Sequence, residues 1–299
     1  MRSRFSLAVV LTLSLVLTGF GGRSAERLGG RIVFSVGGDL YVVNADGSQF
    51  RQVTRTRHLV EQEPTWSPDG TSIAYATLGA SDKSGLWRMA ADGSKRRMLY
   101  QEASNATGPV SNPAWSPDGR RIAFASTRTG AWEIWTYSQD GTLDDVTRQG
   151  FAVHPSWSPN SKRLAYAGLI AAGHGSIFTI GLDGRDRREV SHATVDDESP
   201  VWSPNGKWIA LRSLNPDWQK HEADSLTIVS AAGTVRRTLV TGGVIFPAAW
   251  SPKSNSVLFL WRPSPTSARV QLYVVPTTGG KPRPVPGTQG AAGSASWHG

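Results

Sequence analysis

The stretch Pro64-Thr65-Trp66-Ser67-Pro68-Asp69-Gly70 decides the fold, because it returns along the chain at nearly regular intervals. Copies of it start at Pro113, Pro155 and Pro200, a looser copy surrounds Trp250, and the fragment Ala295-Ser296-Trp297 comes last. Successive tryptophans of the motif are 42 to 49 residues apart. A period of this length indicates that each repeat is one supersecondary unit and that the units pack against each other.

Each copy predicts four short antiparallel strands. Ser-Pro-Asp-Gly favours a tight turn, because Pro fixes φ at its first corner and Gly accepts a positive φ at its end. An alternating run such as Ile73-Ala74-Tyr75-Ala76 follows, then a second run such as 85–89. An Asp-Gly pair such as Asp92-Gly93 predicts the next hairpin. Four-stranded units that cannot cover both faces alone stack around an axis as β-propeller blades.

The two ends of the repeat predict the number of blades. Residues 32–47 supply the second, third and fourth strands of a unit that lacks its Trp-bearing first strand, and residues 294–297 supply a first strand alone. Together they make one blade beside five complete ones. We therefore predict an all-β, six-bladed β-propeller closed by N- and C-terminal strands that share a blade, which leaves no open edge in the ring. The six repeated tryptophans are expected to pack between adjacent blades.

The pattern Pro-x-Trp-Ser-Pro-Asp-Gly-x-x-Ile-Ala-Phe, present at residues 113–124, resembles the repeat of the TolB-like six-bladed propellers. The resemblance covers residues 26–299 and does not include the additional α/β domain that precedes the propeller in TolB. It implies a module that presents its channel mouth to a protein or peptide partner in the cell envelope.

The first 25 residues are typical of a secretory signal peptide. Arg2 and Arg4 precede the apolar run 5–20, and small residues follow up to Ala25. A retained anchor is the alternative, but 16 apolar residues fall short of the roughly 20 that span a bilayer. We therefore expect residues 26–299 to form one propeller domain of a periplasmic or secreted protein, without a transmembrane segment after cleavage.

Composition excludes several classes of protein. The chain has no cysteine, which excludes a disulfide scaffold, a thiol nucleophile and a Cys-ligated metal site. Its net charge is +9, and +6 without the three arginines of residues 1–25. This charge density is too low for a dedicated nucleic-acid binder, and export makes DNA an improbable partner. We expect a monomer that binds no nucleic acid.

Alternating strand directions assign each group of loops to one face of the disc. The Ser-Pro-Asp-Gly and Asp-Gly turns share one face, here called the turn face. The segments before each Pro-x-Trp lie on the other face, around the mouth of the central channel, where rigid sheets and converging loops favour binding. The candidate binding residues there are Glu61, Glu63, Asn112, His154, Asp196, Asp197 and Glu198. The alternative is that these acids are simply solvated loop ends.

The turn face carries arginines three or four residues after most turn glycines. They are Arg51, Arg96, Arg97, Arg187, Arg188, Arg236, Arg237 and Arg283. One interpretation is a basic rim for an anionic envelope surface or an acidic protein. The other, which we favour, is that they protect the outermost strands from pairing with another chain.

Catalytic signatures are absent from the sequence. It has no Gly-x-Ser-x-Gly, P-loop or dinucleotide motif, and no two histidines stand at metal-ligand spacing. His154 with the nearby acids could hold calcium or manganese, although a structural histidine is the favoured interpretation. We predict a non-enzymatic protein without a cofactor. The alternative is a metal-assisted polysaccharide lyase or hydrolase in which Trp218, in the long loop 214–225, stacks on a sugar.

Overall fold

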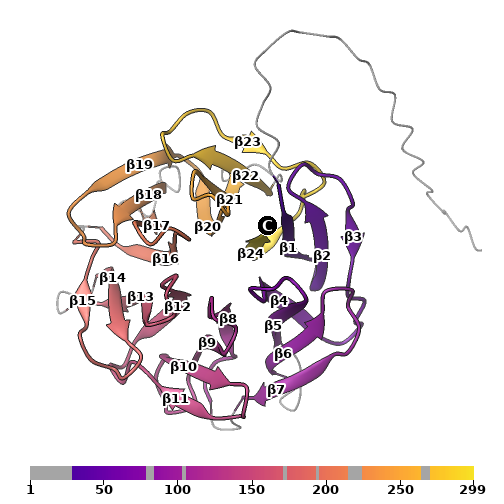
Figure 1. Cartoon of the computed structure of the whole chain (residues 1–299), viewed down its shortest axis with the longest axis horizontal. Coiled ribbons are helices and arrows are strands. Elements are labelled where there is room, and N and C mark those ends of the chain that lie inside the picture. The colour runs from indigo at the N-terminus through magenta and orange to yellow at the C-terminus, as the bar shows by residue number, and fades with distance from the viewer. Residues whose placement is uncertain are drawn as a thin grey trace, which may run out of the picture.

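A computed structural model describes residues 29–78, 84–102, 106–170, 174–192, 195–214, 224–263 and 270–299. Six four-stranded antiparallel sheets stand around a central axis as the blades of a propeller (Figure 1). The predicted all-β, six-bladed fold is therefore confirmed. The expected signal peptide, residues 1–25, lies outside the described residues.

The blades are numbered along the chain, and their strands are given from the axis outward (Figure 1). Blade 1 contains β24 (Ala292–His298), β1 (Arg31–Val36), β2 (Asp39–Asn44) and β3 (Arg51–Gln52), and blade 2 contains β4 (Val60–Trp66), β5 (Ser72–Leu78), β6 (Gly85–Ala90) and β7 (Arg97–Gln101). Blade 3 contains β8 (Ser111–Trp115), β9 (Arg121–Ser126), β10 (Glu133–Ser138) and β11 (Leu143–Asp145), and blade 4 contains β12 (Ala152–Trp157), β13 (Arg163–Leu169), β14 (Gly175–Gly181) and β15 (Arg188–Glu189). Blade 5 contains β16 (Asp197–Trp202), β17 (Trp208–Ser213), β18 (Ser225–Ser230) and β19 (Arg236–Thr241), and blade 6 contains β20 (Val244–Trp250), β21 (Ser256–Arg262), β22 (Gln271–Pro276) and β23 (Arg283–Pro284).

Blade 1 closes the ring. Its inner strand β24 comes from the end of the chain and pairs antiparallel with β1, with Ile32 opposite Trp297 and Val33 opposite Ser296. The first and last described strands thus share one sheet, as the incomplete units at the two ends of the sequence predict.

The Ser-Pro-Asp-Gly motif owes its composition to hydrogen bonds inside the turn. The Ser67 hydroxyl donates to Asp69 Oδ1 (2.5 Å) and accepts from the Ser72 amide (2.9 Å). The Thr71 amide also donates to Asp69 Oδ1 (3.0 Å). These hydrogen bonds lower the pKa of Asp69 to about 2. Each such turn ties an inner strand to the second strand of its blade.

The hydrophobic core is divided among the boundaries between blades. Each of the six interfaces holds its own cluster of buried apolar side chains. Between blades 1 and 2, for example, Val33 and Leu40 pack with Trp66, Ile73 and Tyr75. A blade therefore buries its apolar faces only when it has a neighbour on both sides.

The repeated tryptophans fall into two groups. Four are buried, namely Trp66, Trp157, Trp250 and Trp297. The Trp157 Nε1 donates across the interface to the Ala114 carbonyl of blade 3 (2.9 Å). Trp115 is only half-buried, and its Nε1 donates to the Gly119 carbonyl of its own turn (3.2 Å). Trp202 is half-buried in the same way. Both rings still pack against the apolar cluster between two blades, as expected, but they are less buried than the other four.

Several turn-face arginines tie neighbouring blades together. Arg51 of blade 1 donates forward to the carbonyls of Ala91 (3.0 Å) and Asp92 (3.1 Å) in blade 2. Arg96 of blade 2 donates backward to the Val53 carbonyl (3.1 Å). Arg237 and Arg236 of blade 5 repeat the forward and backward contacts. These arginines therefore act as bridges between blades, a role that neither interpretation of the basic rim included.

Truncation of a buried inner-strand tryptophan tests this description of the core. We expect Trp157→Ala to lower the free energy of unfolding by about 3–5 kcal/mol, as large aromatic truncations in cores do. Trp115→Ala is the matched comparison and should cost clearly less, because its ring is half-exposed. Urea unfolding of both variants measures the difference. Equal losses would show that the two rings are equally buried.

Candidate functional site

The central channel is the main cavity along the axis of the described propeller. It has a volume of about 370 Å³ and is lined by residues from all six inner strands. Each blade contributes the side chain that lies three residues, or in blade 6 four residues, before the repeated tryptophan of its inner strand, a set that we call the channel ring. The channel ring consists of Glu63, Asn112, His154, Ser199, Phe246 and Ser294.

Four members of the channel ring share an unusual backbone conformation. Glu63, Asn112, His154 and Ser199 each precede a proline and have φ between 52° and 55°. Each lies at a point where the pairing of the inner strand with the second strand shifts register. Left-handed backbone is costly for residues other than glycine and concentrates at functional sites. Its repetition in four blades indicates a bulge built to place a side chain against the channel.

Glu63 and Asn112 join two neighbouring blades inside the ring. The Asn112 amide donates to Glu63 Oε2 (2.6 Å), and Asn112 Nδ2 donates to Glu63 Oε1 (2.8 Å). Burial raises the pKa of Glu63 although both hydrogen bonds act in the opposite direction. The carboxylate is thus already occupied by protein donors.

His154 lies in the ring on the next blade. Burial lowers the pKa of His154, while the charge of Glu198 acts to raise it and that of Arg212 to lower it. Its Nδ1 is buried and has no hydrogen-bond partner within the described part of the chain. The neutral imidazole lines the channel, while its Nδ1 is enclosed by the protein.

Glu198 lies beside the channel in a compact ion-pair cluster. Arg212 donates to Glu198 Oε1 (2.7 Å) and to Asp224 Oδ2 (2.6 Å). The same guanidinium lies over the ring of Phe246, with 4.2 Å between its Cζ and the ring centroid. Glu198 thus shares the Arg212 guanidinium with Asp224, and the cluster fixes one wall of the channel at Phe246.

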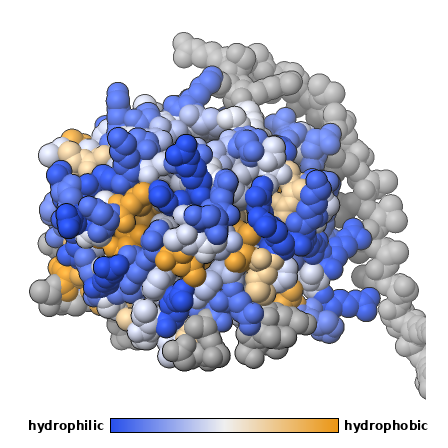
Figure 2. Space-filling model, turned by 60° about the horizontal axis from the view of Figure 1, so that its bottom comes forward, coloured by the Kyte–Doolittle hydropathy of each residue, from blue (hydrophilic) through white to orange (hydrophobic). Residues whose placement is uncertain are grey.

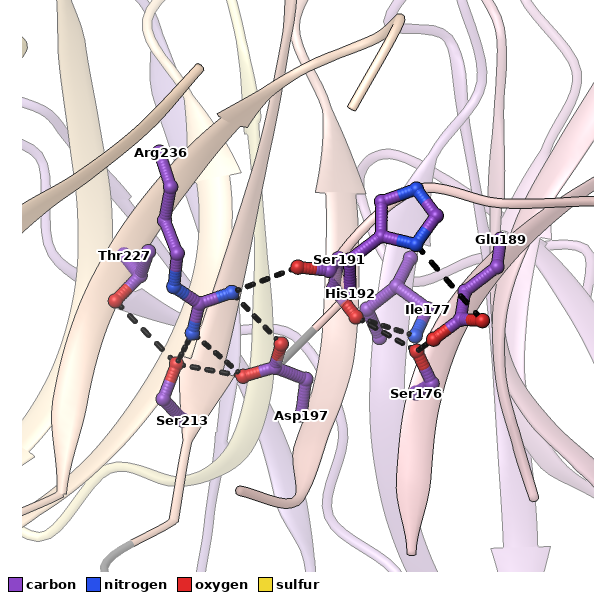
Figure 3. A network of polar contacts seen from close by, with 9 residues as sticks. All are labelled: Ser176, Ile177, Glu189, Ser191, His192, Asp197, Ser213, Thr227 and Arg236. Carbon is purple, nitrogen blue, oxygen red and sulfur yellow. Dashed lines mark hydrogen bonds and ion pairs between the residues drawn. The ribbon is translucent and has the colours of Figure 1, made fainter. Parts of the chain in front are cut away.

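Glu61 and Asp197 occupy equivalent positions in blades 2 and 5, and both are buried away from the channel. Asp197 forms an ion pair with Arg236 (2.8 Å) and accepts a hydrogen bond from Ser213 (2.7 Å), as Figure 3 shows. Glu61 lies 3.6 Å from Arg96, and burial is the main cause that raises its pKa. Both acids thus bind the turn-face arginines that bridge adjacent blades.

Asp196 takes a third position, on the rim of the disc. It is 47% exposed, accepts a hydrogen bond from the Gly175 amide (2.6 Å), and has His174 Nδ1 3.6 Å away. Of the seven candidates, the structure thus brings Glu63, Asn112 and His154 together in the channel. Glu198 lies beside them.

Three members of the ring are not among the candidate binding residues. Ser199, Phe246 and Ser294 line the channel with the three candidates. A signal for Ser199 was present, because it precedes Pro200 as Glu63 precedes Pro64. Glu198 was a candidate because it is an acid. The residue that lines the channel is Ser199, which directly precedes the proline.

The ring does not fit a metal centre. Among the described residues, no group of three or more histidine and carboxylate side chains is placed to hold a metal ion. The ring itself offers one histidine and one carboxylate, and Asn112 already occupies that carboxylate. Trp218 and most of the loop 214–225 lie outside the described residues.

The face of the described propeller seen in Figure 2 is largely hydrophilic. Figure 2 shows apolar residues only in small patches separated by hydrophilic ones. Among the described residues the exposed large apolar side chains are Phe50, Val60, Phe151, Leu169 and Val235, which belong to different blades or loops. Single apolar residues of this kind are normal on a monomer, so the channel is the strongest candidate for a binding site.

The repeat also identifies the family. The family model of the TolB beta propeller domain matches residues 77–254. The chain belongs to this family. No curated protein sequence matches the chain.

Solved structures share the propeller fold. TolB from Acinetobacter baumannii has a TM-score of 0.74 at 19% identity, and the match covers 90% of this chain and 66% of that one. The putative TolB from Agrobacterium tumefaciens has a TM-score of 0.68 at 21% identity, with 87% of this chain and 90% of that chain covered. An oligogalacturonate lyase from Vibrio parahaemolyticus has a TM-score of 0.57 at 12% identity, with 83% and 71% covered.

The TolB-type propeller described here is built of strands. Within its described residues, no helix has the length and apolar character needed to cross a membrane.

The pH dependence of stability tests the environment of His154. A histidine titrates near pH 6.5 in the unfolded chain, and burial lowers the pKa of His154 in the fold. Its contribution to stability is therefore complete above about pH 6.5 and is lost as the pH falls towards the lowered value. We expect the melting temperature of His154→Asn to fall less than that of the wild type between about pH 7 and pH 5.

His154→Asn introduces the same residue type that blade 3 carries at the equivalent position, Asn112. His192→Asn is the control, because His192 is 59% exposed. Identical pH profiles of His154→Asn and the wild type would contradict the buried, neutral state of His154.

Proposed function

We propose that this chain is a non-enzymatic binding module of the cell envelope that takes a peptide segment of a protein partner into its central channel. The observation that carries the proposal is the channel ring, six side chains from six rigid blades that converge on one cavity of about 370 Å³. Membership of the TolB propeller family supports it.

The chemistry of the channel suits a peptide better than an ion. Proline and tryptophan side chains from the inner strands form apolar walls, and Ser199, Ser294 and His154 add hydrogen-bonding groups. A mostly apolar cavity of this size with a few fixed polar groups is the usual form of a specific binding site.

The fixed positions of the charged side chains around the channel favour binding over catalysis. The charged groups around the channel are held by protein partners, Glu63 by Asn112 and Glu198 by Arg212. A peptide can therefore enter without meeting a carboxylate that lacks hydrogen-bond donors. Export through residues 1–25 would place the module in the periplasm or outside the cell.

The alternative of a metal-assisted polysaccharide lyase draws on the fold that the Vibrio lyase shares with this chain. Another structure of an oligogalacturonate lyase, at 13% identity and a TM-score of 0.57, contains manganese. The channel ring here does not fit such a centre, because it brings together one histidine and one occupied carboxylate.

Narrowing the channel tests the proposal. Ser199→His places an imidazole where blade 4 carries His154 with the same backbone geometry, so the fold should accept it. We expect this variant to recover at least tenfold less of the partner that the wild type captures from an envelope extract. Tenfold corresponds to the loss of about 1.4 kcal/mol of binding free energy. Quantitative mass spectrometry of the captured proteins provides the measurement.

Asp183→Asn on the exposed turn face is the matched control and should capture the partner as the wild type does. Melting temperatures establish that all three proteins are folded. Capture of the same partner in equal amounts by Ser199→His and the wild type would reject the channel as the binding site.

A further inference from the structure

Four arginines surround a half-buried tryptophan on the turn face, where blades 2 and 3 meet. Arg88 and Arg97 come from β6 and β7, and Arg120 and Arg121 come from the turn before β9 and its first residue. With Trp115 they line a shallow depression, here called the arginine pocket. Its enclosed space is about 20 Å³, which holds one group of the size of a water oxygen.

The arrangement of charge in the pocket is unfavourable for the protein alone. Arg88 and Arg97 are direct cross-strand partners, and like charges in this position destabilise a sheet. In the other five blades the position of Arg88 is neutral. It is occupied there by Val42, Thr136, Thr179, Ile228 and Val274. The second positive charge is therefore a feature of this blade and not of the repeat.

No carboxylate of the described residues forms an ion pair with an arginine of the pocket, although the charge of Arg121 helps to lower the pKa values of Asp118 and Asp140. Arg88 donates to the Ser72 hydroxyl (2.9 Å) and lies over the Trp115 ring at 5.4 Å. The side chains of Arg97, Arg120 and Arg121 make no hydrogen bond or ion pair within the described ranges. By contrast Arg163, the counterpart of Arg121 in blade 4, forms an ion pair with Asp186 (2.5 Å).

The nearest acids are held by their own turns. Asp118 accepts hydrogen bonds from the Ser116 hydroxyl (2.7 Å) and the Arg120 amide (3.0 Å), and the charges of Arg120 and Arg121 act on it only as unpaired neighbours. Asp140 accepts from the Thr142 amide (3.0 Å). The guanidinium groups of the pocket thus keep donors free for an external anion.

We propose that the arginine pocket binds a phosphate group. Guanidinium groups match the geometry of phosphate oxygens and form charge-assisted hydrogen bonds with them, often in pairs. One phosphate oxygen fits the enclosed space, and the remaining oxygens face Arg97 and Arg120, which are exposed. The phosphate can belong to a soluble phosphorylated compound or to a lipid headgroup, and both would bind through the same contacts. The pocket lies on the face opposite the channel mouth, so it does not depend on the proposed function.

Thermal unfolding of the intact chain in inorganic phosphate tests the proposal. We expect the melting temperature to rise with phosphate concentration relative to sodium chloride of the same ionic strength, because a ligand of the folded state stabilises it. Arg97→Ala and Arg120→Ala should each weaken phosphate binding about tenfold, as expected for the loss of a charge-assisted hydrogen bond. Arg97→Ala should unfold in chloride at or above the wild-type temperature, since it removes the repulsion with Arg88.

Lys162→Ala is the matched control, because Lys162 follows the turn of blade 4 as Arg120 follows that of blade 3, and it is exposed. Its phosphate response should equal that of the wild type. The absence of a phosphate response in the wild type, or an equal response in Arg97→Ala and Arg120→Ala, would overturn the proposal.

Sedimentation with vesicles distinguishes the two sources of phosphate. Vesicles of phosphatidylcholine alone are compared with vesicles that also contain phosphatidic acid, whose headgroup is a phosphate monoester. If the protein binds the vesicles with phosphatidic acid, and Arg97→Ala and Arg120→Ala both reduce this binding, the pocket is assigned to a lipid headgroup. A phosphate response without vesicle binding would assign it to a soluble ligand. Vesicle binding that both variants retain, together with no phosphate response, contradicts the site.

Discussion

The pairing of β24 with β1 is the constraint on which the rest of the molecule depends. The apolar core lies in six clusters between blades, so each blade is stable only with a neighbour on both sides. If blade 1 lacked its inner strand, the clusters that it shares with blades 6 and 2 would open. Closure also fixes the distance between opposite blades, and the channel ring can converge on one cavity only for that reason.

The sequence alone predicts those features of the fold that depend on residues close together in the chain. The turn motif is recognisable because Ser67 and Asp69 satisfy each other's hydrogen bonds within a few residues. Its five copies, together with the incomplete units at the two ends of the repeat, predict six blades. Side-chain direction on the inner strands was harder to predict. In a regular strand, Glu61 and Glu63 would face the same side, but the bulge at Glu63 breaks the alternation. Glu61 therefore points into a blade interface while Glu63 lines the channel, and only long-range partners such as Arg96 reveal the difference.

The two faces of the disc use charge differently. Around the channel, ionised groups are paired at short range, as in the cluster of Glu198, Arg212 and Asp224. On the turn face, Arg51 and Arg237 bridge blades through backbone carbonyls. The arginine pocket departs from both patterns, because its arginines form no ion pair with a carboxylate within the described residues, and Arg88 reaches the neighbouring blade through the Trp115 ring and not through a backbone carbonyl. Some arginines thus bridge blades, while others gather in the arginine pocket. The net charge of +9 does not distinguish these two groups.

Ring closure can be measured directly, because the chain contains no cysteine. Val33 and Ser296 are opposite each other on β1 and β24, within the range that a disulfide requires. We predict that the double variant Val33→Cys, Ser296→Cys forms an intramolecular disulfide in the native state, and that oxidation raises its melting temperature by constraining the unfolded chain. Free thiols in the folded protein after oxidation, or disulfides only between molecules, would contradict the closed six-bladed ring and the channel built on it.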